Sequence, residues 1–181
     1  MKHLIFLPFI LLLFTCNQAD YSNIWEQAPE GNHISIKRAN KKWRNVSVIA
    51  KSSRIDNYFS LNIGRIERYH ESHNLSFHSV PKEIGKHPVC LAIQIQDETP
   101  DEMTHIRASY SSVIPEDAWI ARYLCVDDPE NYFTITDYDP QTQVISGNFK
   151  VKLKATFRAN PEETDEFIWV ESENFTALIE D

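Results

Sequence analysis

The segment from Phe149 to Arg158 constrains the fold most strongly, because apolar and polar side chains alternate along it without interruption. The residues of one parity are Phe149, Val151, Leu153, Ala155 and Phe157, and those of the other are Lys150, Lys152, Lys154, Thr156 and Arg158. A period of two with one apolar and one basic face is typical of an antiparallel strand that is buried on one side. We therefore expect the first set to enter the core and the second set to face outward.

The same alternation recurs along most of the chain, whereas helical periodicity is nearly absent. It is found in the stretches 55–63, 89–95, 120–126, 132–137 and 168–179. In the last stretch the parity switches, which predicts a bulge or turn near 171–174. Many alternating segments separated by turn residues indicate an all-β protein. We predict an antiparallel β-sandwich or flattened barrel of about 8–10 strands with little helix, formed as a single domain by residues 32–181.

The stretch 135–149, ITDYDPQTQVISGNF, places Asp137 and Asp139 around a tyrosine and so resembles a cation or acid–base site. Its flanks alternate as strands do, however, and Pro140 cannot donate to a β-ladder. The sequence from Asp139 onward suits a turn with proline at its second position, so we interpret the two carboxylates as the corner of a hairpin. Gly147 falls inside the second strand, which predicts a bulge or a large neighbour packed across it.

The N-terminus has the pattern of a secretory signal. Lys2 precedes the apolar run 4–14, which is much shorter than the roughly 20 residues that a membrane-spanning helix needs. The run ends in LFTC, which is similar to a bacterial lipobox, whose cysteine is acylated and becomes the mature N-terminus. We expect lipidation at Cys16; ordinary cleavage near Ala19 and a cytosolic protein with an apolar N-terminus are the alternatives.

The expected processing defines three segments: a lipoprotein signal peptide at 1–15, a polar tether at 16–31 and the folded domain. An asparagine follows Cys16, which favours the outer membrane over the inner one and leaves open the periplasmic or the surface face. The net charge is −8, and removal of 1–15 takes away Lys2 and no acidic residue. A negative chain without a basic cluster argues against nucleic-acid binding, which depends on Lys and Arg neutralising phosphates.

If Cys16 carries lipid, Cys90 and Cys125 remain, an even number in a compartment that permits disulfides. If the stretches 89–95 and 120–126 pair as antiparallel strands with the two cysteines opposed, their apolar residues share the other face. This predicts a cross-strand disulfide between Cys90 and Cys125. The alternative is two small, half-buried residues without a bond.

Motifs for chemistry are weak throughout the chain. His70, Glu71 and His73 lack the HExxH spacing of zinc hydrolases and fit a solvated turn better. The acidic loop 127–131 lacks the spaced carboxylates of a calcium loop, and none of the 4 glycines belongs to a GxSxG elbow. We therefore predict no metal site, no cofactor and no catalytic residue. A hydrolase of envelope polymers that uses loop carboxylates is the less favoured alternative.

Aromatic residues make up 12% of the chain and include Trp25, Trp43, Trp119 and Trp169. Exposed aromatic rings on a β-sandwich can stack on sugar rings, which would make the protein a glycan binder. Core packing or anchoring of a protein interface is the alternative use of the same residues.

Four stretches resemble an uncharacterised all-β lipoprotein family of Bacteroidota, a domain of unknown function. They are 36–43, 71–81 with 84–87, 131–139 with 145–149, and 173–176. The family usually has a tyrosine where this chain has His87, and Asn174-Phe175 lacks the usual preceding glycine pattern. The resemblance implies an all-β fold and a place in the cell envelope, and it implies no catalytic residues.

Together these observations predict a non-enzymatic envelope lipoprotein whose β-sandwich binds a protein partner or a glycan. It would contact the membrane through its N-terminal lipid. A structural or accessory subunit of an outer-membrane assembly is the alternative.

Overall fold

A computed structural model describes residues 32–38, 41–43, 46–66, 72–90, 105–114 and 118–181. The strands within them are β1 (His33–Arg38), β2 (Lys41–Lys42), β3 (Val46–Ser52), β4 (Tyr58–Ile66), β5 (Ser72–Pro81), β6 (Gly85–His87), β7 (Arg107–Ile114), β8 (Ala118–Cys125), β9 (Tyr132–Asp139), β10 (Val144–Arg158) and β11 (Phe167–Glu180). The described residues contain no helix, and hence none long and apolar enough to cross a membrane. The all-β prediction is confirmed.

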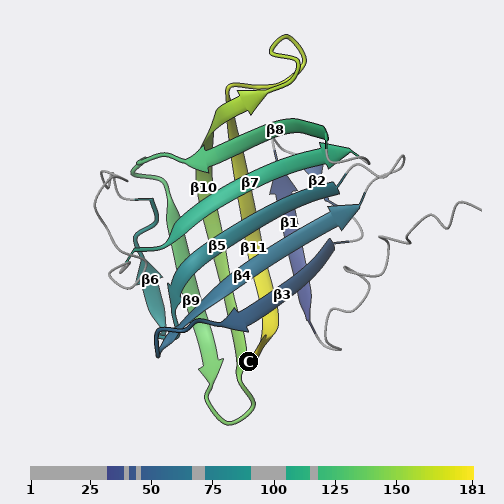
Figure 1. Cartoon of the computed structure of the whole chain (residues 1–181). Coiled ribbons are helices and arrows are strands. Elements are labelled where there is room, and N and C mark those ends of the chain that lie inside the picture. The colour runs from purple at the N-terminus through teal and green to yellow at the C-terminus, as the bar shows by residue number, and fades with distance from the viewer. Residues whose placement is uncertain (1–31, 39–40, 44–45, 67–71, 91–104, 115–117) are drawn as a thin grey trace, which may run out of the picture.

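The strands belong to one sheet that folds into two layers. In Figure 1, β3, β4, β5, β7 and β8 run diagonally across the front, and β1, β11, β10 and β9 run behind them at a steep angle. The hydrogen-bonded order is β2-β1-β11-β3-β4-β5-β7-β8-β10-β9-β6, and a further pairing of β10 with β11 closes the sheet. The predicted fold class is confirmed, although β3 and β11 run parallel to each other, which the alternation pattern does not reveal.

Strand β10 connects the two layers, which accounts for its length. Its first half pairs with β9 and its second half with β8, while β11 lies along most of it. Phe149, Val151 and Leu153 are fully buried, as their parity predicts. The prediction for Phe157 is wrong, because this side chain is 45% exposed. A register shift against β8 after Ala155 reverses the face on which Phe157 lies.

The core between the layers is built around four phenylalanines. Phe77 from β5 contacts Phe133 on β9 and Phe149 on β10, with ring centroids 5.0 and 4.6 Å apart. Phe133 also lies 5.5 Å from Phe175 on β11. All four rings are buried, so this cluster joins the front layer to the back layer by apolar contact.

Gly147 lies on β10 between β9 and β11, both of which approach it closely. A Cβ atom at this position would be 2.2 Å from the backbone oxygen of Thr134 and 2.8 Å from the ring of Phe175. The pairing of β10 with both neighbours shifts register beside it. The pairing of β11 with β1 also shifts, between the partners Asn174 and Ser172. The predicted bulges near Gly147 and in 171–174 are both confirmed.

The Asp-Tyr-Asp stretch forms the corner between β9 and β10, as predicted. Asp139 accepts hydrogen bonds from the backbone N–H of Gln141 at 2.8 Å and from the Thr142 hydroxyl at 2.7 Å. The Thr142 hydroxyl, followed by the Gln141 N–H, holds the pKa of Asp139 below its usual value. Asp137 is exposed on the strand before it. Asp139 therefore shapes the turn, whereas Asp137 faces solvent.

Candidate functional site

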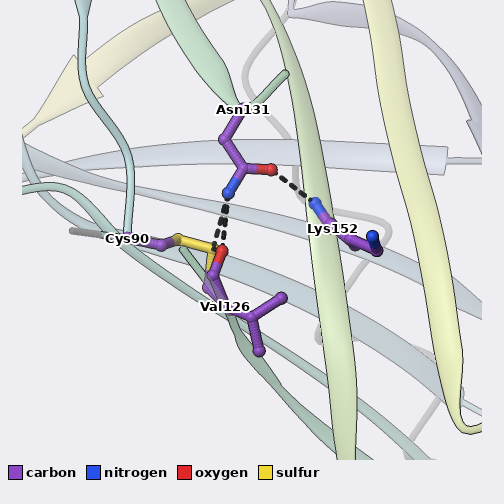
Figure 2. Close-up of a disulfide and its surroundings, with 5 residues drawn as sticks. Cys90, Val126, Asn131 and Lys152 are labelled. Atoms are coloured by element: carbon purple, nitrogen blue, oxygen red, sulfur yellow. Dashed lines mark hydrogen bonds between the residues drawn. A yellow bond between two sulfur atoms is a disulfide. The ribbon is translucent and has the colours of Figure 1, made fainter. Parts of the chain in front are cut away.

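Of the residues expected to carry function, Cys16 lies outside the described residues, as do the signal peptide 1–15 and the tether 16–31. Cys90 and Cys125 are joined by a disulfide with their Cα atoms 5.6 Å apart, a usual separation (Figure 2). Lipidation of Cys16 therefore remains a prediction, whereas the disulfide is part of the described fold.

The disulfide does not join two directly paired strands, so the predicted opposition of Cys90 and Cys125 across such a pair is wrong; residues 91–95 of the expected strand lie outside the described residues. The edges of β8 are occupied by β7 and β10, which leaves none for a third strand. Instead, Cys90 has a positive φ of 61° and donates its N–H to the backbone oxygen of Ile106 at 2.8 Å. The disulfide thus ties the chain before β7 to the end of β8.

Asn131 holds the loop after Cys125 against β10 (Figure 2). Its side chain donates to the Val126 carbonyl at 2.7 Å and accepts from the Lys152 N–H at 2.8 Å. The residue is 8% exposed, so these bonds satisfy a buried amide that would otherwise be costly. The disulfide and Asn131 together fix the path of the acidic loop that follows β8.

The acidic loop directs its carboxylates toward lysines of β10. Asp128 lies 2.9 Å from Lys152 Nζ, and Glu130 is bonded to Lys150 Nζ. The Glu130 backbone N–H, followed by Lys152, lowers the pKa of Asp128, and Glu130 raises that of Lys150. Among the described residues no group of three or more His, Cys, Asp or Glu side chains could hold a metal ion.

The outward side chains of β10 and β11 form a surface that we call the Trp169 face, comprising Lys150, Lys152, Lys154, Phe167, Trp169 and Glu171. Register places Lys152 opposite Trp169 and Lys154 opposite Phe167. Lys150 Nζ lies 4.5 Å from the Trp169 ring centroid and Lys152 Nζ 5.4 Å from it. The lysines therefore lie along the rings, in the geometry of cation–π contacts.

A hollow of about 320 Å³ lies at the Trp169 face. The side chains that line it include Lys37 from β1, Glu130, Lys150, Glu171, and the rings of Phe167 and Trp169. Lys37 bridges to Glu173 at 2.5 Å and to Glu171 at 3.9 Å. Two lysines and two glutamates thus surround an aromatic wall, and the volume falls at the lower end for small-molecule sites.

A second polar cluster lies inside the domain around His73. The sequence-based prediction that His73 lies in a solvated turn is wrong. His73 is on β5 and 5% exposed, and its Nδ1 is 2.6 Å from the Tyr110 hydroxyl. Arg38 donates to the same hydroxyl at 2.8 Å. The Trp43 ring packs 5.6 Å from His73. This cluster connects β1, β5 and β7, and we interpret it as a structural element of the core.

A second outer surface, which we call the Trp119 patch, lies on β8 and β10. Its exposed apolar members are Trp119 (44%), Leu124 (44%) and Phe157 (45%). Arg122 lies 4.7 Å from the Trp119 ring centroid and pairs in register with Phe157. The patch has aromatic and apolar groups with an arginine, the residue types enriched in protein interfaces.

The alternation within 149–158 predicts that the lysines face outward. The sequence around them does not indicate which aromatic rings they contact. Lys152 and Trp169 are brought together by the β10–β11 register, and Lys37 reaches the site from β1. The tryptophans were the available signal: Trp119 is exposed and Trp169 half-buried on the outer surface, whereas Trp43 is buried.

The fold and these surfaces define an all-β domain that carries a charge-paired aromatic hollow on its outer face. Comparison of the chain with protein-family models, with curated proteins and with solved structures found no match. The resemblance to a lipoprotein family therefore remains a prediction.

Proposed function

We propose that this protein is a non-enzymatic lipoprotein of the outer membrane, anchored through Cys16, whose β-domain binds a protein partner or a glycan. The observation that carries the binding role is the Trp169 face, where an aromatic wall lies beside a hollow lined by polar groups. Ligand sites commonly combine such apolar surfaces with a few polar groups that fix orientation. The LFTC motif before Asn17 supports the anchor.

The charge pairing at the hollow favours binding over hydrolysis. A general acid needs a carboxyl group whose pKa is raised toward the working pH. The Lys37 ammonium group instead lowers the pKa of Glu173 by hydrogen bonding to it. Glu130 and Asp128 form ion pairs with Lys150 and Lys152. These carboxylates are therefore suited to orient a ligand and poorly suited to protonate one.

A subunit of an outer-membrane assembly is the second candidate function, and the Trp119 patch favours it. Trp119, Leu124 and Phe157 are large apolar side chains that remain exposed on one surface. A neighbouring subunit that covered them would gain the hydrophobic free energy that the isolated domain forgoes.

Co-purification from solubilised envelope tests these two functions against each other. The full-length protein carries an affinity tag, and the protein and carbohydrate recovered with it are compared between wild type, Trp169→Ala and Trp119→Ala. Binding through the Trp169 face predicts a component that is lost only with Trp169→Ala. A component lost only with Trp119→Ala would favour the subunit function. Recovery of the same material with all three proteins would contradict a binding role for either surface.

Replacement of Cys16 tests the anchor separately. Cys16→Ala removes the acylation site and should move the protein from the membrane fraction to the soluble fraction. Asp137→Ala, an exposed substitution that leaves all three cysteines in place, is the control and should remain with the membrane. Retention of Cys16→Ala in membranes after a high-salt wash would contradict lipid anchoring.

A further inference from the structure

The charge balance of the hollow narrows the kind of ligand that the Trp169 face can accept. Its charged lining consists of Lys37 and Lys150 against Glu130 and Glu171. Lys37 is bridged to Glu173 and, at a longer distance, to Glu171, and Lys150 is bridged to Glu130, so the ammonium groups are already neutralised locally. A polyanion needs unneutralised cations to release its counterions. The hollow therefore offers little attraction to an acidic polymer.

The same lining is unlike the centre of a protein–protein interface. Such centres are depleted in Lys and Glu and enriched in aromatic and other large side chains. The Trp169 ring instead lies among the amino groups of Lys150 and Lys152, within 4.5 and 5.4 Å of its centroid. Burying these charges under a protein would remove their hydration without adding partners. The Trp119 patch, with Leu124 and Phe157, matches an interface centre better.

A neutral saccharide fits both the rings and the ion pairs. A sugar hydroxyl is a donor and an acceptor at once, so it can accept from an ammonium group and donate to the adjacent carboxylate. The C–H face of a pyranose can pack on an indole ring by dispersion. Because Lys150 lies over the Trp169 ring and is bonded to Glu130, a saccharide that stacked on this side of the ring would take the place of the Lys150 ammonium group.

We propose that the Trp169 face is a binding site for neutral oligosaccharides, with Trp169 as the stacking platform and the Lys37–Glu171 and Lys150–Glu130 pairs as hydroxyl partners. This inference rests on the proposed binding function and names the ligand class of the same face. The hollow of about 320 Å³ would hold only part of a longer glycan, which would continue along β10 and β11. Lys154 and Phe167, which are next to each other in register, lie on that path.

Affinity measurements with defined glycans test the proposal. The full-length protein, in a detergent without a sugar headgroup, is titrated by calorimetry with cellohexaose, maltohexaose, mannohexaose and chitohexaose. Heparin and polygalacturonate serve as anionic probes. At least one neutral hexasaccharide should bind with a dissociation constant of about 1 mM or tighter, and neither polyanion should bind.

Two variants assign the binding to the face. Trp169→Ala should weaken the binding of the neutral glycan by about tenfold or more. Trp119→Ala is the matched control, because Trp119 also lies on the outer surface, 4.7 Å from a cationic group. This variant should bind as the wild type does. Thermal unfolding of each variant verifies that it is folded.

The outcomes separate this inference from the proposed function. Absence of binding to all four neutral glycans would overturn the inference, as would Trp169-dependent binding of a polyanion. If a Trp169-dependent component still co-purifies from the envelope in either case, the proposed binding function stands without a neutral glycan. If no such component co-purifies either, both are overturned.

Discussion

Lys150 Nζ lies 4.5 Å from the centroid of the Trp169 ring, and Glu130 is bonded to the same ammonium group. Cation–π contacts and ion pairs at the protein surface contribute little to stability, because water screens the charges. This arrangement therefore adds little to the stability of the domain. It positions an aromatic ring, a donor and an acceptor at one point of the outer surface, which is what a binding site requires.

The disulfide should be present in the folded protein and should stabilise it substantially. Cys90 and Cys125 are 35 residues apart, and for a loop of this size the chain-entropy relation gives about 4 kcal/mol. Under denaturing, non-reducing conditions neither thiol should react with iodoacetamide, and both should react after reduction. Cys125→Ser should lower the free energy of unfolding by a similar amount. Two reactive thiols in the unreduced protein would contradict the bond.

Gly147 should tolerate no side chain. Gly147→Ala would place a methyl group against the Thr134 backbone oxygen and the Phe175 ring, so we expect a loss of about 3 kcal/mol or more in unfolding free energy. The double variant Gly147→Ala/Phe175→Leu removes the contact with the ring and leaves the contact with the backbone. It should therefore remain destabilised relative to Phe175→Leu alone. Denaturant unfolding measures both differences, and full rescue by Phe175→Leu would contradict the backbone contact.

Acidic pH should remove the contribution that Asp139, at the hairpin corner, makes to the free energy of unfolding. The pKa of Asp139 is lower in the folded protein than in the unfolded chain, chiefly through the hydrogen bond from the Thr142 hydroxyl. Its ionised form therefore stabilises the fold above the unfolded pKa of about 4, and this contribution is lost as the pH falls through the folded pKa. The difference in urea midpoint between wild type and Asp139→Ala should shrink from pH 7 to strongly acidic pH. Asp137→Ala is the matched control, and a difference that grows on acidification would contradict the assignment.

Local patterns predicted the parts of the fold that depend on neighbours in sequence. The parity of Phe149, Val151 and Leu153, the corner at Asp139 and the bulge opposite Gly147 all follow from side-chain period and turn chemistry. Each reflects a preference expressed within a few residues.

The rest depended on which strands meet, which the sequence pattern does not specify. Phe157 turns outward because of a register shift against β8, and the alternation within β10 carries no sign of it. Cys90 reaches Cys125 from the segment preceding β7, because β7 and β10 occupy both edges of β8. Trp169 acquires its lysines through the register of β10 with β11, set across the hairpin that joins them.

The most direct test of the central claim is the NMR spectrum of the indole N–H groups during titration with the four neutral hexasaccharides. The chain has 4 tryptophans, and their signals can be assigned by single substitutions. Binding at the Trp169 face predicts that the Trp169 signal shifts progressively with glycan concentration, while those of buried Trp43 and of Trp119 stay in place. A Trp169 signal that does not move with any of the four glycans, or a shift confined to Trp119, would contradict the account.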